Sequence, residues 1–460
     1  MMYLSQIATA VSGQMHGDEV MLSGVSIDSR QSCENSLFVA LDGERFDAHE
    51  FISQAEQNGA AAVLIEKPVA TTLPTVQVAD TFVALKQVAS WWRAQFVLPV
   101  IGVTGSVGKT SVKEMLGAIF SEIGKGLVTH GNLNNEIGVP LTLMRLVEDD
   151  LFAIIEMGMN HAGEISRLTQ IARPTVALIN NAAAAHLEGL GTVAAVAAAK
   201  GEIFEGLSED GVAVINNDDD YAEFWHQLAA PHKVVTFGLK NADVTADYQL
   251  HTDHVDLTVH VNGAASSESL KISLNLVGRH NVMNALAAIA VAYAANIPLE
   301  AVANGLANYK PISGRLNITR IGDLTVIDDT YNANPASMRA AIDVLAQFTD
   351  TTLILGDMGE LGDAADQEHL QLGAVAQDRG IDRVFACGEY AAKSIKNFSG
   401  TAISFTDQAR LLNYLADHPV SSGTVLVKGS RSAKMENVVE LIKTKYGKSI
   451  AETEPTEGVA

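Results

Sequence analysis

The hydrophobic and polar positions of the chain alternate between short apolar runs and stretches with helical spacing. The clearest example covers residues 100–120, where an apolar run ends at a glycine-rich loop. After that loop, the apolar positions 112, 115, 116, 119 and 120 lie at i, i+3, i+4, i+7 and i+8, so they share one face of a helix. The pattern therefore predicts a strand, a loop and a helix whose buried face packs on the strand.

The loop between this strand and this helix reads T-G-S-V-G-K-T-S at 104–111. Glycines allow backbone N–H groups to surround phosphate oxygens at a helix N-terminus, Lys109 brings a positive charge to the β- and γ-phosphates, and the Thr110 hydroxyl can bind Mg²⁺. Val103 stands where the strict motif has its first glycine. We expect nucleotide binding rather than an incidental glycine-rich turn. The expected contacts are Gly105, Ser106, Val107, Gly108, Lys109, Thr110 and Ser111.

Before residue 99, short apolar runs at 37–41, 60–65 and 75–78 alternate with polar turns, which predicts a small α/β unit. Its loops carry hydroxyl, guanidinium, carboxylate and imidazole groups that can hold a phosphorylated ligand. A solvated surface loop explains the same pattern equally well. The candidates are Ser29, Arg30, Asp47 and His49.

In the middle of the chain, the apolar run at 151–155 ends in Glu156, as in a buried parallel strand that delivers a carboxylate to its C-terminal edge. Glu156 is the first candidate metal ligand. A second strand is predicted at 174–179, and His186 follows it, although a lone histidine is more often structural than a ligand. The loop at 129–138 is rich in Gly and Asn, which suits a ligand loop, and it contains Asn134 and Asn135.

The next predicted helix has a lysine within its apolar stripe. Lys200 lies seven residues after Val193 and four before Phe204, on the face that should be buried. One possibility is that the aliphatic part of the side chain extends far enough for the amine to reach solvent. The other is that the amine is desolvated, has a lowered pKa and takes part in chemistry.

Residues 243–275 alternate as in antiparallel strands and include His251, His254 and His260. Because these histidines lack a shared helical face or a fixed ligand spacing, we expect solvated strand residues rather than a metal site. A helix rich in Ala follows. Its start carries Asn281 and Asn284 at i and i+3, where their amides can bind an adenine edge or cap the helix.

A third α/β unit is expected after residues 311–314. Three apolar runs, at 325–327, 353–355 and 425–427, each end in polar residues, which favours one shared crevice edge. The first of these ends carries Asp329, and the last carries Lys428. After the first run, Asn334 suits a helix N-cap and Pro335 the first helical turn.

Length, charge and cysteine content narrow the class of protein. A chain of 460 residues should form about three domains, and no apolar stretch is long enough for a membrane span or resembles a signal sequence, so we expect a cytoplasmic protein. The formal net charge of −23 argues against binding nucleic acid or an anionic membrane. Cys33 and Cys387 form no C-x-x-C pair, so neither a disulfide framework nor a structural zinc site is indicated.

Taken together, the motifs resemble the Mur ligases of peptidoglycan synthesis across essentially the whole chain. Beyond the loop at 104–111, the resemblance is carried by E-M-G-M-N-H at 156–161, A-A-A-H-L-E at 183–188, A-K-G-E-I at 199–203, G-R-H-N-V-M-N at 278–284, S-G-R-L at 313–316 and D-D-T-Y-N-A-N-P at 328–335. Three further segments resemble the members that add D-alanyl-D-alanine: G-N-L-N-N-E-I-G-V-P at 131–140, G-D-M-G-E-L-G at 356–362 and K-G-S-R at 428–431. The D-N-P-R motif of the members that add the third amino acid is absent.

This resemblance implies an α/β protein of three domains. They are a domain for the UDP-sugar peptide at 1–98, a central ATPase domain with a mostly parallel sheet at 99–312, and a Rossmann-like domain at 313–460. The implied reaction is ATP-dependent ligation of D-alanyl-D-alanine to UDP-N-acetylmuramoyl-tripeptide through an acyl phosphate and a tetrahedral intermediate. ATP and Mg²⁺ are the implied cofactors, and we expect a monomer. The third residue of the tripeptide, lysine or diaminopimelate, stays open.

The resemblance also implies roles for particular residues. Thr110, Glu156, His186 and a modified Lys200 would hold metal, while Asn281, Asn284, Arg315 and Asp329 would hold or sense the nucleotide. Catalytic roles fall to Lys109, Lys200, His186 and Arg315. The modification expected of Lys200 is a carbamate, since only a neutral amine adds CO₂. Substrate contacts are expected from Ser29, Arg30, Asp47, His49, Asn134, Asn135, Tyr331, Asn332, Asn334, Lys428 and Arg431.

Two other functions compete with this interpretation. A folylpolyglutamate synthetase resembles the same ATPase core but has no need of the N-terminal domain. A GTPase-type switch or binding module requires an N-K-x-D motif, which this sequence lacks.

Overall fold

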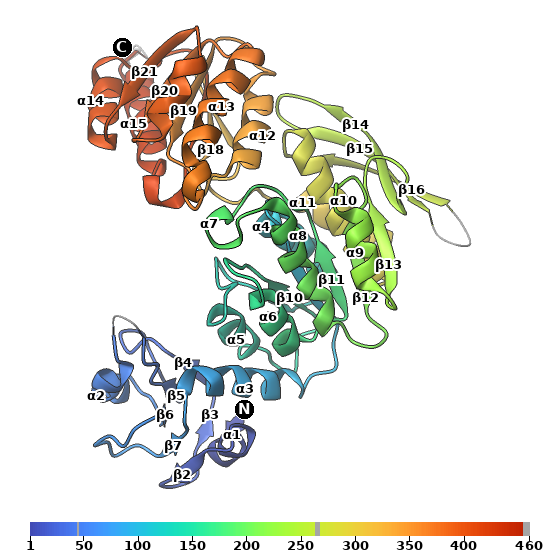
Figure 1. The fold of residues 1–460 in the computed structure, drawn as a ribbon, viewed down its shortest axis with the longest axis vertical. Coiled ribbons are helices and arrows are strands. Elements are labelled where there is room, and N and C mark those ends of the chain that lie inside the picture. The colour runs from blue at the N-terminus through green and yellow to red at the C-terminus, as the bar shows by residue number, and fades with distance from the viewer. Residues whose placement is uncertain (44–45, 263–266, 454–460) are drawn as a thin grey trace, which may run out of the picture.

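The computed structural model describes residues 1–43, 46–262 and 267–453. Three sheet-based domains follow one another along an elongated molecule, with the N-terminal domain at one end and the C-terminal domain at the other (Figure 1). Residues 44–45 of the polar loop expected to bind ligand, and residues 454–460 of the predicted third domain, lie outside the described residues. Within the described residues, no helix combines the length and the hydropathy that crossing a membrane requires.

The N-terminal domain contains a five-stranded sheet in the order β2-β7-β6-β5-β4, in which only β2 is antiparallel to its neighbour. The three apolar runs expected here form β5, β6 and β7, and Leu37, Val39 and Leu64 are fully buried in the core. The elements are β1 (Met2–Tyr3), α1 (Leu4–Ala10), β2 (Gln14–His16), β3 (Met21–Leu22), β4 (Gly24–Ser26), β5 (Ser36–Val39), η1 (Ala48–Phe51), α2 (Ile52–Gln57), β6 (Ala62–Ile65), β7 (Thr75–Gln77) and α3 (Thr81–Arg93).

The central domain is built on a nine-stranded sheet in the order β16-β15-β14-β13-β12-β11-β8-β10-β9. The strands from β9 to β14 pair in parallel, and β14, β15 and β16 form antiparallel hairpins, as the alternation at 243–275 predicts. The strands are β8 (Val100–Thr104), β9 (Leu127–Val128), β10 (Ala153–Glu156), β11 (Val176–Ile179), β12 (Val212–Asn216), β13 (Lys233–Phe237), β14 (Val244–Leu250), β15 (Val255–Asn262) and β16 (Ser267–Leu274).

Helices cover both faces of this sheet. The predicted stripe on α4 is buried as expected, and α4 packs against α10 and α11 on one face. On the other face, α3, α5, α6 and α8 share a second hydrophobic cluster. The helices are α4 (Lys109–Ser121), α5 (Gly138–Leu143), α6 (Glu164–Ala172), α7 (Leu187–Leu190), α8 (Val193–Gly201), η2 (Glu202–Gly206), α9 (Ala222–Ala229), α10 (Arg279–Ala294) and α11 (Leu299–Asn308).

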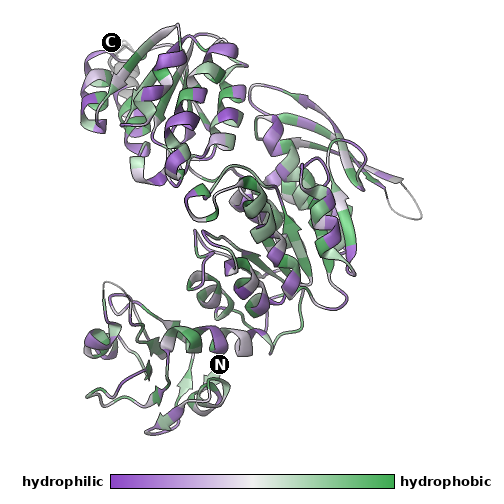
Figure 2. Cartoon of the chain, viewed as in Figure 1, coloured by the Kyte–Doolittle hydropathy of each residue, from purple (hydrophilic) through white to green (hydrophobic). Residues whose placement is uncertain are grey.

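The C-terminal domain has a six-stranded sheet in the order β17-β18-β22-β19-β20-β21, parallel except for β17. The three strands with polar ends are neighbours, so the prediction of one shared edge is confirmed. Figure 2 shows hydrophobic residues along the strands and hydrophilic residues on the outer helices. The elements are β17 (Asn317–Ile321), β18 (Leu324–Asp329), α12 (Pro335–Leu345), β19 (Thr351–Gly356), η3 (Gly362–Ala364), α13 (Ala365–Asp378), β20 (Arg383–Cys387), η4 (Ala391–Asn397), β21 (Thr401–Phe405), α14 (Gln408–Asp417), β22 (Gly423–Lys428), η5 (Arg431–Ala433) and α15 (Glu436–Thr453).

Two local predictions can be compared directly with the helices. Asn334 caps α12, because its side chain accepts a hydrogen bond from the backbone N–H of Ser337, and Pro335 is the first helical residue. The helix expected from Val193 to Phe204 is shorter than predicted. It is α-helical only to Gly201 and then tightens into the 3₁₀ turn η2.

Candidate active site

A cavity of about 1640 Å³ lies between the central and C-terminal domains. The central domain contributes the phosphate loop and the residues that follow β10 and β11, while the C-terminal domain contributes the ends of β18 and β22. The described lining contains no residue before Ser106, so the N-terminal domain does not contribute to it. These segments meet at the cavity because parallel strands place their carboxyl ends at one edge of their sheet.

The phosphate loop is held in shape by asparagines from the neighbouring strand. Asn181 Oδ1 accepts a hydrogen bond of 2.9 Å from the backbone N–H of Val107, and Asn180 Nδ2 donates to the Val107 carbonyl at 2.9 Å. Both residues follow β11, which pairs with β8. Both lie outside the predicted set of site residues, although their position directly after a predicted strand is a signal that could identify them.

Gly108 allows the loop to join α4. It lies just before the helix with φ +81°, and a Cβ atom there would lie 2.2 Å from Asn284 Oδ1. Only glycine therefore fits both the backbone conformation and the space. Asn284 Oδ1 also accepts a hydrogen bond from Asn180, and Asn284 Nδ2 donates to Asn281 Oδ1, so α10 is connected to the loop by a chain of amides.

Lys109 lies at the base of the cavity and donates a hydrogen bond of 2.7 Å from Nζ to the Gly105 carbonyl. Burial lowers its pKa, and the charge of Arg315 acts in the same direction, whereas the carboxylates of Glu156 and Glu360 raise it. A cation in this position is ready to meet the negative charge of phosphate oxygens.

Glu156 is at the end of β10 and is 2% exposed. Its Oε1 accepts a hydrogen bond of 2.8 Å from Asn134 Nδ2, whereas Oε2 is buried and has no hydrogen-bond partner among the described residues. A buried carboxylate oxygen without a partner is costly unless a cation or a donor meets it. Since Mg²⁺ prefers carboxylate and hydroxyl oxygens, Glu156 fits the predicted metal site.

His186 faces the C-terminal domain. Its backbone has φ +56°, and its Nδ1 lies 2.7 Å from Oε2 of Glu360, which follows β19 in the other domain. The contact with His186 lowers the pKa of Glu360 against the opposing effect of burial. Glu360 was absent from the predicted site residues, although it lies in the polar segment after a predicted strand.

Lys200 is 1% exposed, so the alternative in which its amine reaches solvent is wrong. Among the residues that the structure describes, its Nζ makes no hydrogen bond or ion pair, and Lys200 does not line the cavity itself. Burial, with a smaller contribution from the charge of Lys109, holds the pKa of Lys200 well below its ordinary value.

Arg315 connects the C-terminal domain to the phosphate loop. Its Nη2 donates a hydrogen bond of 3.0 Å to Thr110 Oγ1, and its guanidinium lies 4.2 Å from the centre of the Tyr331 ring. The buried Nε of Arg315 makes no hydrogen bond within the described part of the chain. The guanidinium thus has a free donor at the edge of the cavity, where an anionic group can accept it.

Asp329 and Lys428 form a buried ion pair at the ends of two neighbouring strands. Lys428 Nζ lies 2.6 Å from Asp329 Oδ2 and donates to the Asn332 carbonyl at 2.9 Å. The pairing follows from the register of β18 and β22, in which these two residues are partners.

The N-terminal candidates interact mainly within their own domain. Arg30 pairs with Asp28, with 2.8 Å between Nε and Oδ1, and Ser29 Oγ donates to Gln54 at 3.0 Å. His49 is buried, with its Nδ1 2.6 Å from Asp47 and its Nε2 accepting from the backbone N–H of Glu66. The structure does not bring these residues to the cavity, and their role in ligand binding stays a prediction.

The remaining candidates line the cavity, and several also have structural partners. Asn135 Oδ1 accepts from the Gly138 N–H at the start of α5, and Arg431 pairs with Glu436 at 3.1 Å. The predicted residues on the cavity wall are Ser106, Val107, Gly108, Lys109, Thr110, Ser111, Asn134, Asn135, Glu156, His186, Asn281, Asn284, Arg315, Asp329, Tyr331, Asn332, Asn334, Lys428 and Arg431.

Three family models match the chain in the same order as its domains. They are the Mur ligase family catalytic domain at residues 21–91, the Mur ligase middle domain at 103–292, and the Mur ligase glutamate ligase domain at 314–431. The chain belongs to the Mur ligase family. The phosphate loop and the cavity wall of this Mur ligase therefore come from the middle and glutamate ligase domains.

Several relatives of this chain share one name. The chain is 43% identical over 449 residues to the UDP-N-acetylmuramoyl-tripeptide–D-alanyl-D-alanine ligase of Escherichia coli, which covers 96% of this chain and 98% of the relative. A crystal structure of MurF from Acinetobacter baumannii superposes with a TM-score of 0.89 at 36% identity, over 95% and 98% of the two chains. MurF from Thermotoga maritima, solved in complex with ADP, matches with a TM-score of 0.81 at 27% identity, over 93% and 98%.

Proposed function

We propose that this Mur ligase uses ATP to join D-alanyl-D-alanine to UDP-N-acetylmuramoyl-tripeptide. The observation that carries the proposal is the cavity in which the phosphate loop faces Arg315, Asp329 and Lys428 of the C-terminal domain. The 43% identity to a ligase of that name, over almost the full length of both chains, supports this choice of substrates.

The proposed reaction has two steps. The tripeptide carboxylate attacks the γ-phosphorus of ATP, which gives an acyl phosphate and ADP. The amine of D-alanyl-D-alanine then attacks the acyl carbon, and the tetrahedral intermediate expels phosphate. Because the first step brings two anions together, cations fixed beside the phosphates lower its barrier, and Lys109 and Arg315 hold such positions.

Mg²⁺ is the metal that the donor set around the phosphate loop fits. Glu156 supplies a buried oxygen without a partner, and Thr110 supplies a hydroxyl, while His186 and a carbamate on Lys200 complete the proposed set. When bound, the metal neutralises charge on the phosphates and orients them. Thr110 Oγ1 accepts a hydrogen bond from Arg315 Nη2, so a metal held by this hydroxyl would compete with that contact.

The carbamate on Lys200 follows from the environment of its amine. A buried amine with a lowered pKa is neutral, and its lone pair can attack CO₂; loss of one proton then leaves a carbamate anion. An anion at this position would balance the charge of Lys109, which acts on Lys200 from nearby.

The other predicted contacts divide among the domains. We assign the nucleotide to Asn281, Asn284 and Asp329, which line the cavity, and the UDP end of the sugar peptide to the N-terminal domain. Because the proposed reaction consumes ATP, we propose that the enzyme acts in the cytoplasm. We also propose that it acts as a monomer.

The proposal is tested by measuring phosphate release while each substrate is omitted in turn. We expect turnover only when ATP, UDP-N-acetylmuramoyl-tripeptide and D-alanyl-D-alanine are all present, because the acyl phosphate is productive only if an amine intercepts it. Tripeptides that end in lysine and in diaminopimelate should be compared in parallel. Comparable turnover with a folate and glutamate would instead identify the folylpolyglutamate synthetase function.

Replacing Lys109 with Ala tests the phosphate loop in the same assay. We expect kcat to fall at least about 100-fold, as for the loss of one preorganised charge donor worth roughly 3 kcal/mol. Lys125→Ala is the matched control, since Lys125 is exposed after α4 and does not line the cavity. Activity of Lys109→Ala within about threefold of the control would contradict the assigned role.

A further inference from the structure

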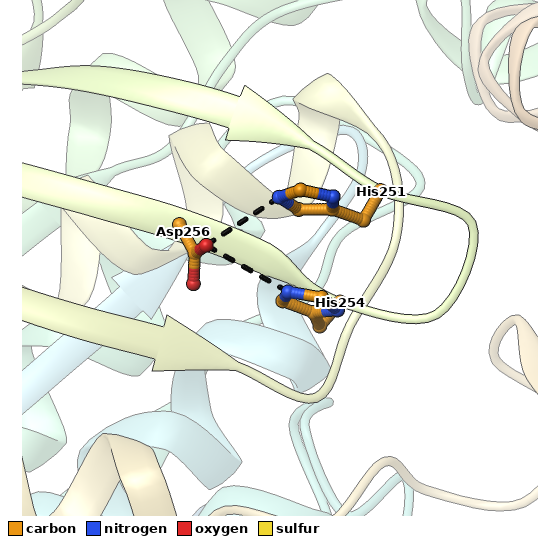
Figure 3. A group of neighbouring side chains, drawn as sticks. All are labelled: His251, His254 and Asp256. Carbon is orange, nitrogen blue, oxygen red and sulfur yellow. Dashed lines mark ion pairs between the residues drawn. The ribbon is translucent and has the colours of Figure 1, made fainter.

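Two histidines and an aspartate meet at the end of the hairpin formed by β14 and β15 (Figure 3). His251 and His254 flank a two-residue turn, and the His251 N–H donates to the His254 carbonyl at 2.9 Å. Asp256 is two residues beyond His254, so it lies on the same face of the hairpin. A tight hairpin brings these residues onto one shared face, which neither helical periodicity nor a fixed ligand spacing in the sequence reveals.

The donor atoms of the three side chains lie close together. Asp256 Oδ2 lies 3.4 Å from His251 Nε2 and 3.7 Å from His254 Nε2, and the donor atoms of all three residues lie within 4.8 Å of one another. Tetrahedral Zn²⁺ with ligands at about 2.0–2.1 Å requires separations of about 3.4 Å between donor atoms. The separations are close to those values, and one of the two stacked rings must turn so that both Nε2 lone pairs meet the ion.

The surroundings of the two imidazoles also suit a metal. His254 Nδ1 lies 2.7 Å from Asp253 Oδ1, and this contact fixes the ring so that Nε2 faces Asp256. Metal-bound histidines usually have such a carboxylate on their second nitrogen. His251 Nε2 is buried and makes no hydrogen bond in the described structure. The two rings stack with centroids 4.1 Å apart.

We propose that His251, His254 and Asp256 bind a divalent transition-metal ion, with Zn²⁺ as the best fit. Two imidazoles and one carboxylate are typical ligands of Zn²⁺, Ni²⁺ and Co²⁺, whereas sites for Mg²⁺ and Ca²⁺ are built mainly from oxygen ligands. The two imidazoles are partly exposed, at 31% for His251 and 33% for His254, and the Asp256 side chain is exposed at 53%. A water molecule can therefore reach the ion as a fourth ligand.

The position of this site is separate from the phosphate loop but borders the same cavity. Leu250, the residue before His251, lines the cavity together with Val344 and Gln347 of the C-terminal domain. Figure 1 shows this end of the hairpin beside α12. A bound ion would cross-link the two strands beside their connecting turn and so stiffen one wall of the space between the domains.

Isothermal titration of the full chain with ZnCl₂ tests the proposal. The protein is first freed of metal, and saturating MgCl₂ and ADP are present so that the nucleotide site is not titrated. We expect one Zn²⁺ to bind per chain, and we expect His254→Ala and Asp256→Asn each to weaken binding at least about tenfold, because each removes a ligand. His260→Ala is the matched control, since His260 is on the same strand but pairs with Asp247.

A second measurement locates the ion directly. Crystals soaked in ZnCl₂ should give an anomalous peak between the three side chains at the zinc edge, and His254→Ala should retain normal phosphate release. Equal Zn²⁺ binding by the parent and His254→Ala, or an equal loss in His260→Ala, would overturn the proposal in favour of solvated strand histidines. An anomalous peak only at the phosphate loop would do the same.

Discussion

At the residue scale, the surroundings of the Lys200 amine indicate which protonation state it has. The Lys200 side chain on α8 is 1% exposed, and its amine makes no hydrogen bond or ion pair within the described residues. An ammonium ion in such a place would be strongly destabilised. The structure therefore favours a neutral amine, which is the form that the proposed carbamate requires.

Replacing Lys200 with Ala should reduce phosphate release at least about 100-fold while the protein still folds, as for loss of one charge partner in a preorganised site. A small carboxylic acid such as acetate should restore part of this activity by supplying the missing anion. Lys109→Ala is the control, because a lost cation cannot be replaced by acetate. An intact mass and a density map that show an unmodified amine in the active enzyme would refute the carbamate.

The lowered pKa of His280 leads us to expect that the stability of the folded chain depends on pH. His280 lines the cavity, and burial lowers its pKa to about 4 from an ordinary 6.5. Between these values the unfolded chain binds the proton and the folded chain does not, so the free energy of unfolding falls as the pH falls from 6.5 to 4. His280→Gln should make this loss smaller by roughly 1–3 kcal/mol. Urea unfolding at several pH values measures the change in the free energy of unfolding. His16→Gln is the control, because His16 is exposed. Identical pH profiles for His280→Gln and the parent would contradict the role assigned to His280.

At the scale of one element, α4 has one glycine at its N-cap and one in its interior, and the two differ in whether a side chain would fit. Gly108, at its N-terminus, has φ +81° and no space for a Cβ atom, whereas Gly117 lies inside the helix, and a Cβ there would lie 3.5 Å from Val128, an ordinary contact. The absence of a side chain at the start of this helix lets its backbone N–H groups come close to a ligand, whereas the helix interior has no such requirement.

The two glycines therefore predict opposite effects of one substitution. Gly108→Ala should lower the free energy of unfolding by about 2 kcal/mol or more and weaken ADP binding, because it adds backbone strain and a steric clash. Gly117→Ala should raise the free energy of unfolding by about 0.5–1 kcal/mol, as Ala does in helix interiors. Urea unfolding and ADP titration measure both effects. Equal stability of the two variants would show that the loop conformation tolerates a side chain.

At the scale of the whole molecule, the middle and C-terminal domains already touch, whereas no described residue of the N-terminal domain lines the cavity. Arg315 bonds to Thr110, and His186 faces Glu360 across the boundary between the two domains. A sugar peptide held by the N-terminal domain must still deliver its carboxylate to the phosphate loop. Closure of the domains would also exclude water from an acyl phosphate.

We therefore expect the radius of gyration to fall when UDP-N-acetylmuramoyl-tripeptide and a non-hydrolysable ATP analogue bind together. Small-angle X-ray scattering of the full chain measures this change, and D-alanyl-D-alanine alone serves as the control ligand. Scattering curves that stay the same with and without both substrates would mean that the open arrangement persists during turnover.

The sequence by itself determined the features that depend on local patterns. Apolar residues at a period of 3.6 identify the buried face of α4, and apolar runs with polar ends identify β10, β18 and β22. Because parallel strands end at one edge of a sheet, these patterns also predicted that Glu156 would lie near the phosphate loop. The exact domain borders stay predictions.

Only the tertiary structure decided which distant side chains meet. The contact of His186 with Glu360 and the fixing of His49 between Asp47 and Glu66 depend on packing between segments far apart in the sequence. The grouping of His251, His254 and Asp256 depends on a tight turn that the alternating pattern does not specify. A periodic pattern records which face of an element is buried, but the partner of each polar atom is chosen by long-range packing, where each buried group must find its donor or acceptor.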